Sequence, residues 1–450
     1  MCGAGSRGVK VHCQVLVAGG GAAGVAAAVA AARAGAEVLL VERKTFLGGT
    51  YVAGLHQQVC GLYSNGPTPS DELLNGGLTA EIVSLLRAAN SGRGPIRLGA
   101  VDVLPCPALV FAQTLSELAA SQKGLTLRLQ TAVKSVVRQE GNIAAVELEV
   151  AGGNPSQYSL RREGLQPFPP YRIREATRTV GREWLRSRNL PAASGQDQNN
   201  ATVSREEVSP SILIDCTGEG AVLRLTGAPL LSPPPGERQL AGYTIRITGV
   251  RDWNDVLFIK APYAVRQGIE VGALPAYLKF TTLIRGEASD EAFVKMSYPS
   301  AGLRDGLDPR KDAEALHEWL RRNVPEFAQS RLAETSPAIL DRDGDRLAGD
   351  YVLAESDVLG GVRVPDPAAR GAWPVEYWDQ VRGPTYRYLR PGDTYDIPLR
   401  CLRSSRVPHL LCAGRCISAD ARAQASVRVA GLCLAIGEAA GLEAARRVRG

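Results

Sequence analysis

The sequence predicts an α/β fold in which a domain with a parallel sheet is interrupted by an α+β domain with a mainly antiparallel sheet. Three observations lead to this class. A buried strand, a glycine-rich turn, a helix and a second strand follow one another near the N-terminus. Short apolar strands recur far along the chain, at 211–215 and 409–412. Between them, Tyr243–Ile247 and Ala276–Ile284 alternate in the way that is typical of antiparallel strands.

The glycine-rich turn has the pattern and setting of a dinucleotide-binding motif. The strand His12–Ala18 runs directly into GGGAAG, a GxGxxG sequence that opens the predicted helix Ala22–Ala34. Gly19 permits a tight turn, Gly21 lets the backbone approach a pyrophosphate, and Gly24 lets the helix lie close to the sheet. The diphosphate is expected at the helix N-terminus, where free N–H groups and the positive end of the helix dipole meet it.

An acidic residue completes the nucleotide-binding pattern. The second strand, Glu37–Val41, ends at Glu42, where a carboxylate accepts hydrogen bonds from an adenosine ribose and disfavours a 2′-phosphate. Strand, glycines, helix, strand and acid in this order predict a Rossmann-like domain. No second GxGxxG follows a predicted strand, so a separate nicotinamide domain is not expected.

The stretch after Glu42, RKTFLGGT, resembles the glutathione-reductase-like class of FAD proteins, in which it continues along the cofactor. Gly48 and Gly49 would let the backbone approach the pyrophosphate and the flavin ring. The resemblance extends to a helix at Pro107–Ser121 and to a strand at Leu125–Val137, whose Val133 would contact the adenine through its backbone. It also covers the strand that ends before Cys216 and the Thr217-Gly218 turn that follows this cysteine.

The C-terminal part resembles the FAD-dependent oxidoreductase family more specifically. LLCAGRCIS carries arginine where many FAD proteins carry an acid, and the family resemblance includes LVERKTFLGGTYVAGL, DYVLAESDVLGG, GAWPVEYWD, YDIPLR, IPLRCLRS, ASVRV and GEAAG. It spans most of the chain and is weakest over 152–210. It implies that a helix at Ser426–Arg447 points its positive N-terminus at the flavin N1 and C2 carbonyl, which favours the reduced anion. The predicted cofactor-binding residues are Gly19, Gly21, Ala22, Ala23, Gly24, Glu42, Arg43, Gly48, Gly49, Thr50, Val133, Thr217, Gly218, Gly414, Arg415, Ser426, Val427 and Arg428.

The FAD-binding segments alternate with other parts of the chain. One of these contains a predicted helix at Leu78–Ala89. Another contains a predicted basic helix at Ile173–Arg188, beside a polar stretch, and is expected to be either a lid or a surface insertion. The predicted division is an FAD-binding domain at 1–55, 106–150, 211–229 and 395–450, a cap segment at 56–105, an insertion at 151–210 and a substrate domain at 230–394.

Once FAD serves as the electron sink, the protein needs groups that hold the substrate and move a proton. His56, Cys60, Tyr63 and Asn65 follow the flavin-facing glycines and are expected to line that cavity. His56 is the leading catalytic candidate because imidazole titrates near working pH; a packed ring or a covalent flavin link stays open. Arg400 is a candidate anchor for a carboxylate or the flavin, with an inter-domain salt bridge as the alternative.

The aromatic and acidic group in GAWPVEYWD has two interpretations. Trp373, Glu376, Tyr377 and Trp378 are either a substrate wall or a contact between domains. The cysteines on either side of Arg415 have no neighbouring histidine or cysteine cluster, so a metal site is not expected.

The leading functional hypothesis is an FAD-dependent dehydrogenase or oxidase that passes a hydride from a small organic molecule to flavin N5. Oxygen, a quinone or a protein carrier would accept the electrons. One alternative is a thiol/disulfide flavoenzyme that uses Cys60, and another is an electron-relay flavoprotein subunit without a substrate of its own. The sequence identifies neither the substrate nor the direction, and it leaves the oligomeric state open.

Composition disfavours several other classes. A net charge of +6 over 450 residues, without a basic run, argues against a nucleic-acid partner. The nine scattered cysteines are typical of reduced thiols in a cytoplasmic protein, so no disulfide is expected. The first ten residues lack an apolar signal core, and Val17–Ala32 is too short and too weakly apolar for a membrane span.

Overall fold

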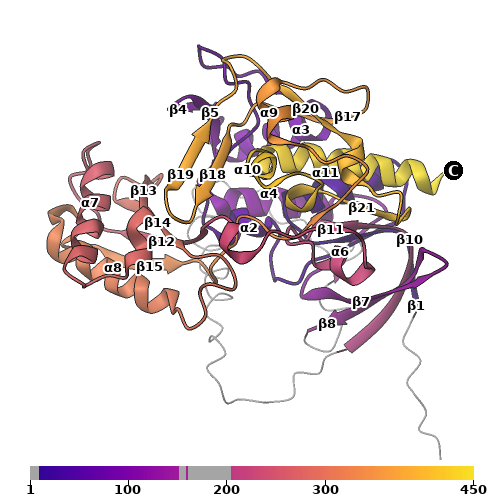
Figure 1. Cartoon of the computed structure of the whole chain (residues 1–450), viewed down its shortest axis with the longest axis horizontal. Helices are drawn as coiled ribbons and strands as arrows, with labels where there is room; N and C mark the ends of the chain where they lie inside the picture. Colours follow the sequence, from indigo (N-terminus) through magenta and orange to yellow (C-terminus); the bar gives the residue numbers. More distant parts are fainter. Residues whose placement is uncertain (1–9, 152–158, 161–203) are drawn as a thin grey trace, which may run out of the picture.

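The computed structural model describes residues 10–151, 159–160 and 204–450 (Figure 1). The predicted helix Ile173–Arg188 and most of the predicted insertion at 151–210 lie outside these residues. The boundaries of the predicted domains stay predictions.

Strands from both ends of the chain form the main sheet. β1 (Lys10–Ala18) lies between β2 (Val38–Val41) and β10 (Ser204–Asp215), and both pairings are parallel. β6 (Leu125–Arg128) extends the sheet in parallel beyond β2, and β21 (Leu410–Cys412) pairs in parallel with the end of β10. The α/β fold with a parallel Rossmann-like sheet is therefore confirmed.

Antiparallel strands flank this parallel core. The first half of β10 pairs with β8 (Asn142–Val150), which pairs with β7 (Thr131–Gln139). β9 (Ser159–Leu160) pairs with β6 at the opposite edge. The predicted single strand at Leu125–Val137 is thus two strands, because the chain turns at Gln130, where φ is 51°.

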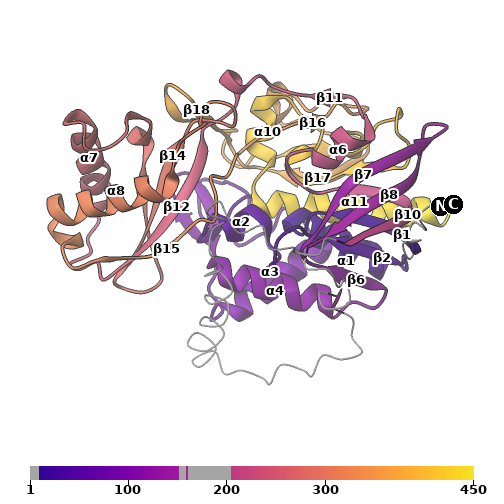
Figure 2. The same ribbon diagram turned by 90° about the horizontal axis from the view of Figure 1, so that it is seen from below.

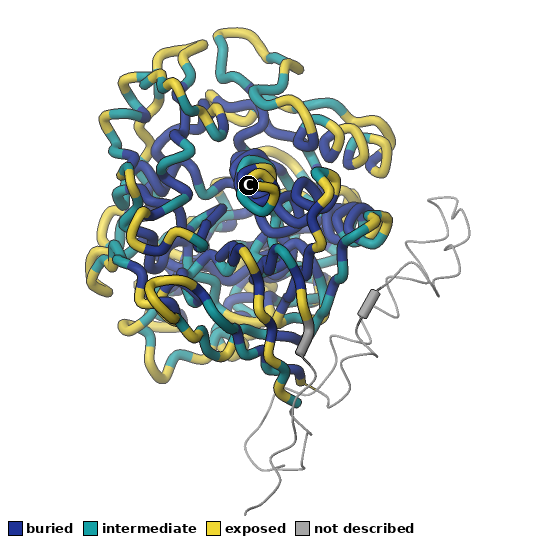
Figure 3. The backbone as a smooth tube through the Cα atoms, turned by 90° about the vertical axis from the view of Figure 1, so that its right-hand side faces the viewer, coloured by how far each residue is buried: buried dark blue, intermediate teal, exposed yellow. Residues whose placement is uncertain are grey.

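Two glycine- and alanine-rich helices cover one face of the main sheet. α1 (Ala22–Arg33) packs along α11 (Ala430–Val448). A Cβ atom at Gly437 would lie 2.1 Å from the Ala23 carbonyl oxygen, and one at Gly441 would lie 2.2 Å from that of Ala27. The two backbones therefore touch, and α11 runs through the buried centre of the molecule (Figure 3).

Two further helices pack against α1. α3 (Gly77–Ala89) and α4 (Ala108–Ala120) lie within one residue of their predicted ends. Glu438 of α11 accepts hydrogen bonds from the Leu78 and Thr79 backbone N–H groups, at 2.9 and 3.1 Å, and so caps α3.

The predicted C-terminal helix Ser426–Arg447 is broken in the structure. α10 (Ala421–Val427) ends before Val429, whose backbone is extended, and α11 continues at an angle of 94° to it. The Gly431 N–H donates to the Cys60 carbonyl at 2.9 Å, which fixes the first turn of α11 against the loop after α2 (Gly49–Ala53). Among the described residues, no single helix is long and apolar enough to cross a membrane, and these two pass that test only as a bent pair.

A separate lobe contains the antiparallel sheet (Figures 1 and 2). Its own hydrophobic core draws on residues between Ala241 and Phe327. The strand order is β13 (Thr282–Arg285), β14 (Glu291–Tyr298), β12 (Ala241–Thr248) and β15 (Arg331–Thr335), with α7 (Leu257–Glu270) and α8 (Pro309–Asn323) packed beside it.

One predicted strand of this lobe is partly wrong. Ala276–Phe280 is a 3₁₀ helix, and only Thr282–Arg285 is a strand. Pro275 opens a turn in which the Leu278 N–H donates to the Pro275 carbonyl, so Leu278 is buried while Ala276 and Lys279 face outward. The apolar residues alternate as they would in a strand, which misled the prediction.

The remaining described strands form small two- and three-stranded sheets, with two short helices, α6 (Ala221–Thr226) and α9 (Glu355–Gly360). From Leu347 onward, most buried apolar side chains belong to the main core, and Ala372 and Trp378 are exceptions. The strands are β3 (Gln58–Val59), β5 (Val101–Pro105) and β4 (Ile96–Leu98); β11 (Leu230–Leu231) and β16 (Arg346–Leu347); β17 (Pro367–Gly371) and β20 (Tyr395–Pro398); β18 (Val375–Asp379) and β19 (Gly383–Arg387).

Candidate functional site

A cavity of about 930 Å³ extends from the glycine-rich turn after β1 to the β18–β19 hairpin and the sheet of the lobe. Most of the residues predicted from sequence line it. They are Gly19, Gly21, Ala22, Ala23, Glu42, Arg43, Gly48, Gly49, Thr50, His56, Cys60, Val133, Thr217, Gly218, Gly414, Arg415 and Arg428. Gly24, Arg400, Ser426 and Val427 do not.

Each of the three motif positions requires glycine for a different structural reason. Gly19 has φ 104°, and a Cβ there would lie 2.6 Å from the Cys216 carbonyl oxygen. At Gly24 a Cβ would lie 1.7 Å from the Gly19 carbonyl oxygen, so this glycine closes the turn. At Gly21 the nearest atom would be the Gly49 Cα, 3.9 Å away. A side chain at Gly21 would therefore enter the cavity, where the motif places a diphosphate.

The N-terminus of α1 faces the same end of the cavity. Gly21 is its N-cap, no side chain caps it, and its first turn has no acidic residue. Ala22 and Ala23 line the cavity there. Uncapped N–H groups and the positive end of a helix dipole suit an anionic group.

Glu42 is buried at the cavity wall and is held rigidly. Its Oε2 accepts from the Gly20 N–H at 2.6 Å, and its Oε1 accepts from the Lys44 N–H at 2.9 Å. Each carboxylate oxygen keeps a second lone pair, which suits a ribose hydroxyl.

The break between α10 and α11 also faces the cavity, through Arg428, Val429 and Ala430. Ser426 and Val427, predicted to contact the flavin, are buried at the end of α10. The Ser426 hydroxyl lies 2.6 Å from the Tyr395 hydroxyl and donates to the Trp373 carbonyl. α11 starts later than the predicted helix, so the positive end of its dipole lies at the residues after Val427.

Sequence analysis missed two cations that line the cavity from the lobe side. Lys295 lies on β14, and Arg342 follows β15 in the chain. The Lys295 Nζ is 5.3 Å, and the Arg342 Cζ 3.9 Å, from the centre of the Trp378 ring. A lone lysine within the otherwise mostly apolar strand EAFVKMSY was the available signal for Lys295. The sequence around Arg342 has no feature that predicts its place in the cavity.

Burial and mutual repulsion act on both cations. Burial, and then the charge of Arg342, lower the pKa of Lys295 to about 7. Burial, and then the charge of Arg428, lower the pKa of Arg342 to about 9. The site is therefore rich in positive charge that the protein does not fully compensate.

Glu376 on β18 lines the cavity, and its charge acts on both cations. Trp378 and Trp373 donate their indole N–H groups to its two carboxylate oxygens, at 2.8 and 3.2 Å. Burial opposes ionisation of Glu376, but the charges of Arg428 and Lys295 outweigh it and lower its pKa. Trp373, Glu376 and Trp378 thus form a wall of the cavity, whereas Tyr377 does not line it and is buried in the main core.

His56 and Cys60 also face the cavity. The His56 ring stacks on Tyr51 with a 5.4 Å separation of ring centres. Burial, and then the charges of Lys295 and Arg342, lower the pKa of His56 to about 3, so its imidazole is neutral. Burial raises the pKa of Cys60 to about 12, so its thiol is protonated.

Two neighbours that were expected in the cavity lie elsewhere. Tyr63 is buried in the main core. The Asn65 side chain donates to the Ala372 carbonyl at 2.6 Å. Neither of them lines the cavity.

Arg400 is also absent from the cavity. The 3₁₀ turn after β20 directs its guanidinium to Asp366, with N–O distances of 3.1 and 3.2 Å. Its Cζ lies 5.1 Å from the Tyr351 ring centre. Its prediction as a catalytic residue is not supported, whereas the salt-bridge alternative describes its contact.

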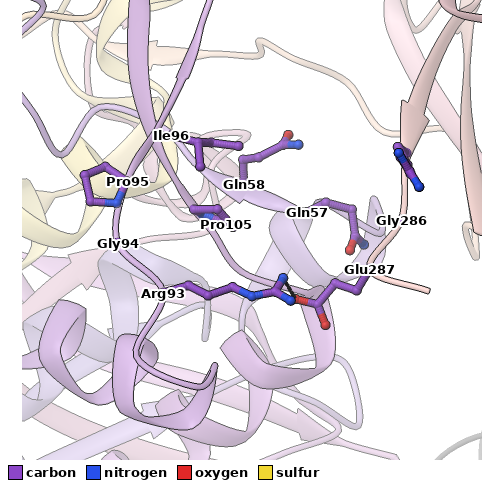
Figure 4. Close-up of a pocket in the computed structure, with 10 residues that line it drawn as sticks. Gln57, Gln58, Arg93, Gly94, Pro95, Ile96, Pro105, Gly286 and Glu287 are labelled. Carbon is purple, nitrogen blue, oxygen red and sulfur yellow. Dashed lines mark hydrogen bonds and ion pairs between the residues drawn. The ribbon is translucent and has the colours of Figure 1, made fainter. Parts of the chain in front are cut away.

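A second cavity of about 520 Å³ adjoins the first and shares Gln58, Ile96 and Arg285 with it (Figure 4). Arg93 and Glu287 reach toward one another across it, with a 3.1 Å contact. This ion pair joins the segment after α3 to the β13–β14 turn.

In the part of the chain that the structure describes, no group of three or more histidine, cysteine or acidic side chains is arranged to hold a metal ion. The eight described cysteines carry no disulfide.

The parallel sheet, the glycine turn at the N-terminus of α1 and the buried acid after β2 together define a nucleotide-binding α/β protein. The chain belongs to the FAD dependent oxidoreductase family, whose model matches residues 14–159 and 192–450. It is therefore an FAD-dependent enzyme. The open space at Gly21, the uncapped α1 and the fixed Glu42 fit this cofactor.

Three solved structures resemble the chain at low sequence identity. A geranylgeranyl bacteriochlorophyll reductase-like protein from Thermoplasma acidophilum is 12% identical, with a TM-score of 0.43 over 98% of this chain and 79% of its own. A flavoprotein/dehydrogenase from Cytophaga hutchinsonii is 12% identical, with a TM-score of 0.45 over 98% and 79%. An anhydrotetracycline hydroxylase from Streptomyces rimosus is 13% identical, with a TM-score of 0.44 over 98% and 63%. No curated protein matches the chain.

Proposed function

We propose that this enzyme exchanges a hydride equivalent between a small organic substrate and N5 of its FAD. The observation that carries the proposal is the continuity of one cavity, which joins the nucleotide-binding turn to His56 and to polar groups of the lobe. When bound, FAD supplies the two-electron acceptor or donor. The protein supplies binding, orientation and proton transfer.

The cofactor half of the cavity provides a place for each part of FAD. The N-terminus of α1 would bind the diphosphate, Glu42 the ribose, and the backbone of Val133 the adenine. Arg428 and the start of α11 would place positive charge at the pyrimidine edge, which stabilises a reduced anionic ring.

His56 is the proposed proton-transfer residue. Within the described residues its ring nitrogens make no hydrogen bond, and the ring lines the cavity. Because its pKa is about 3, it presents an unprotonated nitrogen at neutral pH. A substrate hydroxyl or amine would donate to this nitrogen and lose its proton there as the hydride leaves.

Anaerobic bleaching of the FAD absorbance tests the proposal. A panel of amines, hydroxy acids and thiols is mixed with the protein, and at least one class should reduce the flavin. The variant His56→Asn should keep its FAD and be reduced at least about 100-fold more slowly, as expected for a lost general base. His12→Asn, at an exposed position on β1, is the control and should be reduced at the normal rate.

Two outcomes would contradict this function. Flavin that no panel compound reduces, and that no oxidised counterpart reoxidises, argues for an electron-relay subunit. Loss of reduction in Cys60→Ser but not in His56→Asn argues for thiol chemistry. The protonated state of Cys60 disfavours the thiol route, since the thiolate is the nucleophile.

A further inference from the structure

We infer that the substrate of this enzyme is an organic carboxylate, bound by Lys295 with Arg342 beside it. The inference rests on the proposed function, because it concerns the substrate half of the same cavity. It goes further by naming the charged group through which the substrate is held.

The first step is the state of the Lys295 ammonium. Among the described residues it forms no ion pair with a carboxylate and donates no hydrogen bond, although it lines the cavity. Its contact is with the face of Trp378, at 5.3 Å. An ammonium at the cavity wall has three donors to satisfy, and a ligand that enters the cavity is an available source of acceptors.

The second step is the position of Arg342. Its Nη1 donates to the Leu240 carbonyl, which fixes the guanidinium, while its buried Nη2 has no partner in the described chain. A Cβ built at Gly242 would lie 3.5 Å from this Nη2 and 3.7 Å from the Lys295 Cε. The two cations therefore converge on the face of β12 that glycine leaves open.

The third step is the balance of charge. Arg428, whose buried Nε has no partner in the described chain, adds a third cation. Glu376 is the cavity-lining acid whose charge acts on all three, while Asp343, which does not line the cavity, acts on Arg342 and Arg428. The other acids of the cavity are committed elsewhere. Glu42 binds backbone N–H groups, Asp341 pairs with Arg304, and Glu219 lies near Arg43.

Uncompensated cations in a buried cavity are costly, and an anion that binds between them removes the cost. The walls favour an anion with a carbon skeleton, because Trp373, Trp378, Tyr386 and Tyr388 line the same part of the cavity. A carboxylate meets both conditions. It would also offset the positive potential that lowers the basicity of His56.

Binding experiments on the FAD-loaded protein test the inference without relying on turnover. Small aliphatic and aromatic carboxylates are compared with their own carboxamides, which have the same shape without the charge, by thermal shift and calorimetric titration. At least one carboxylate should raise the melting temperature and bind at least about tenfold more tightly than its amide, as a charge-assisted hydrogen bond does.

Two variants identify the groups responsible. Lys295→Met and Arg342→Met should each weaken the binding of that carboxylate about tenfold to a hundredfold and leave the binding of the amide unchanged. Lys279→Met, at an exposed lysine of the same lobe, is the control. FAD content and melting temperature without ligand show that each variant is folded.

Carboxylates that bind no better than their amides overturn the inference, as does full affinity in both cavity variants. Neither result touches the proposed function, which flavin reduction tests separately. Neutral compounds that reduce the flavin while no carboxylate binds would sustain the function and refute the substrate class.

Discussion

At the residue scale, the motif glycines differ in what their missing side chain achieves. Gly24 lies against the Gly19 carbonyl, whereas Gly21 faces open space in the cavity. Local sequence was sufficient to predict both, because the turn and its helix are contiguous. Lys295 and Arg342 come together only through the lobe, so no local pattern identified the pair.

Gly21→Val should abolish FAD binding, because the new side chain would occupy the space expected for the diphosphate. The protein should stay folded, since the nearest atom to the new Cβ is 3.9 Å away. The measurement is the ratio of flavin absorbance to protein after purification. Gly236→Val, at an exposed glycine with no atom within 4 Å, should keep its FAD. Yellow Gly21→Val protein at normal stoichiometry would refute the placement.

The lowered pKa of Lys295 predicts a pH dependence of stability. From about pH 7 up to the ordinary value of 10.5, the unfolded chain binds a proton that the folded chain lacks. Stability from this group therefore rises with pH across that window and is flat below it. The titratable and charged groups that interact with Lys295 are Arg342, Glu376, Arg428, Cys60 and His56.

Denaturant unfolding at pH 7 and pH 9 measures this effect. Lys295→Met should be more stable than the unmodified protein at pH 7, and its advantage should shrink at pH 9. Lys279→Met should show no such trend, because that lysine is exposed. A stability advantage of Lys295→Met that is equal at both pH values would mean that folding does not lower the pKa of Lys295.

At the element scale, the contact between α1 and α11 connects the two ends of the chain. Their facing surfaces are glycine and alanine, so the backbones approach closely. The helices α1, α3 and α4 were predictable from the local sequence. The break at Val429 was not, because it depends on the hydrogen bond between Gly431 and Cys60, which are far apart in sequence.

Gly437→Ala should destabilise the protein by about 1–3 kcal/mol, because the added methyl would meet the Ala23 carbonyl at 2.1 Å. FAD should also bind more weakly, since α1 would have to move. Chemical denaturation and flavin titration measure the two effects. Gly360→Ala, with no atom within 4 Å, is the matched control. Unchanged stability in Gly437→Ala would mean that the helices separate at no cost.

At the scale of the whole molecule, two hydrophobic cores meet at the cavity. The parallel sheet and its position in the chain were predictable from the glycine motif and the recurring apolar strands. The division of the central region between the two cores was less predictable, because β17 and β18 belong to the main core although they follow the lobe in sequence. Which core a strand joins depends on distant partners, as in the pairing of β17 with β20.

The ion pair between Arg93 and Glu287 should contribute little to holding the lobe in place. Both side chains are substantially exposed, 54% and 40%, so their coupling energy should be below about 1 kcal/mol. A double-mutant cycle with Arg93→Ala and Glu287→Ala measures it, and 1 M salt should remove it. A coupling above about 2 kcal/mol would mean that this pair fixes the lobe.

The use of both chain ends in one sheet also constrains how the protein is made. On the ribosome, a nascent chain displays the alanine-rich surface of α1 long before α11 emerges to cover it. Flavin capture must then wait until synthesis reaches α11. A premature stop before α11 would leave the dinucleotide turn intact and still yield a colourless polypeptide, prone to self-association through its uncovered face.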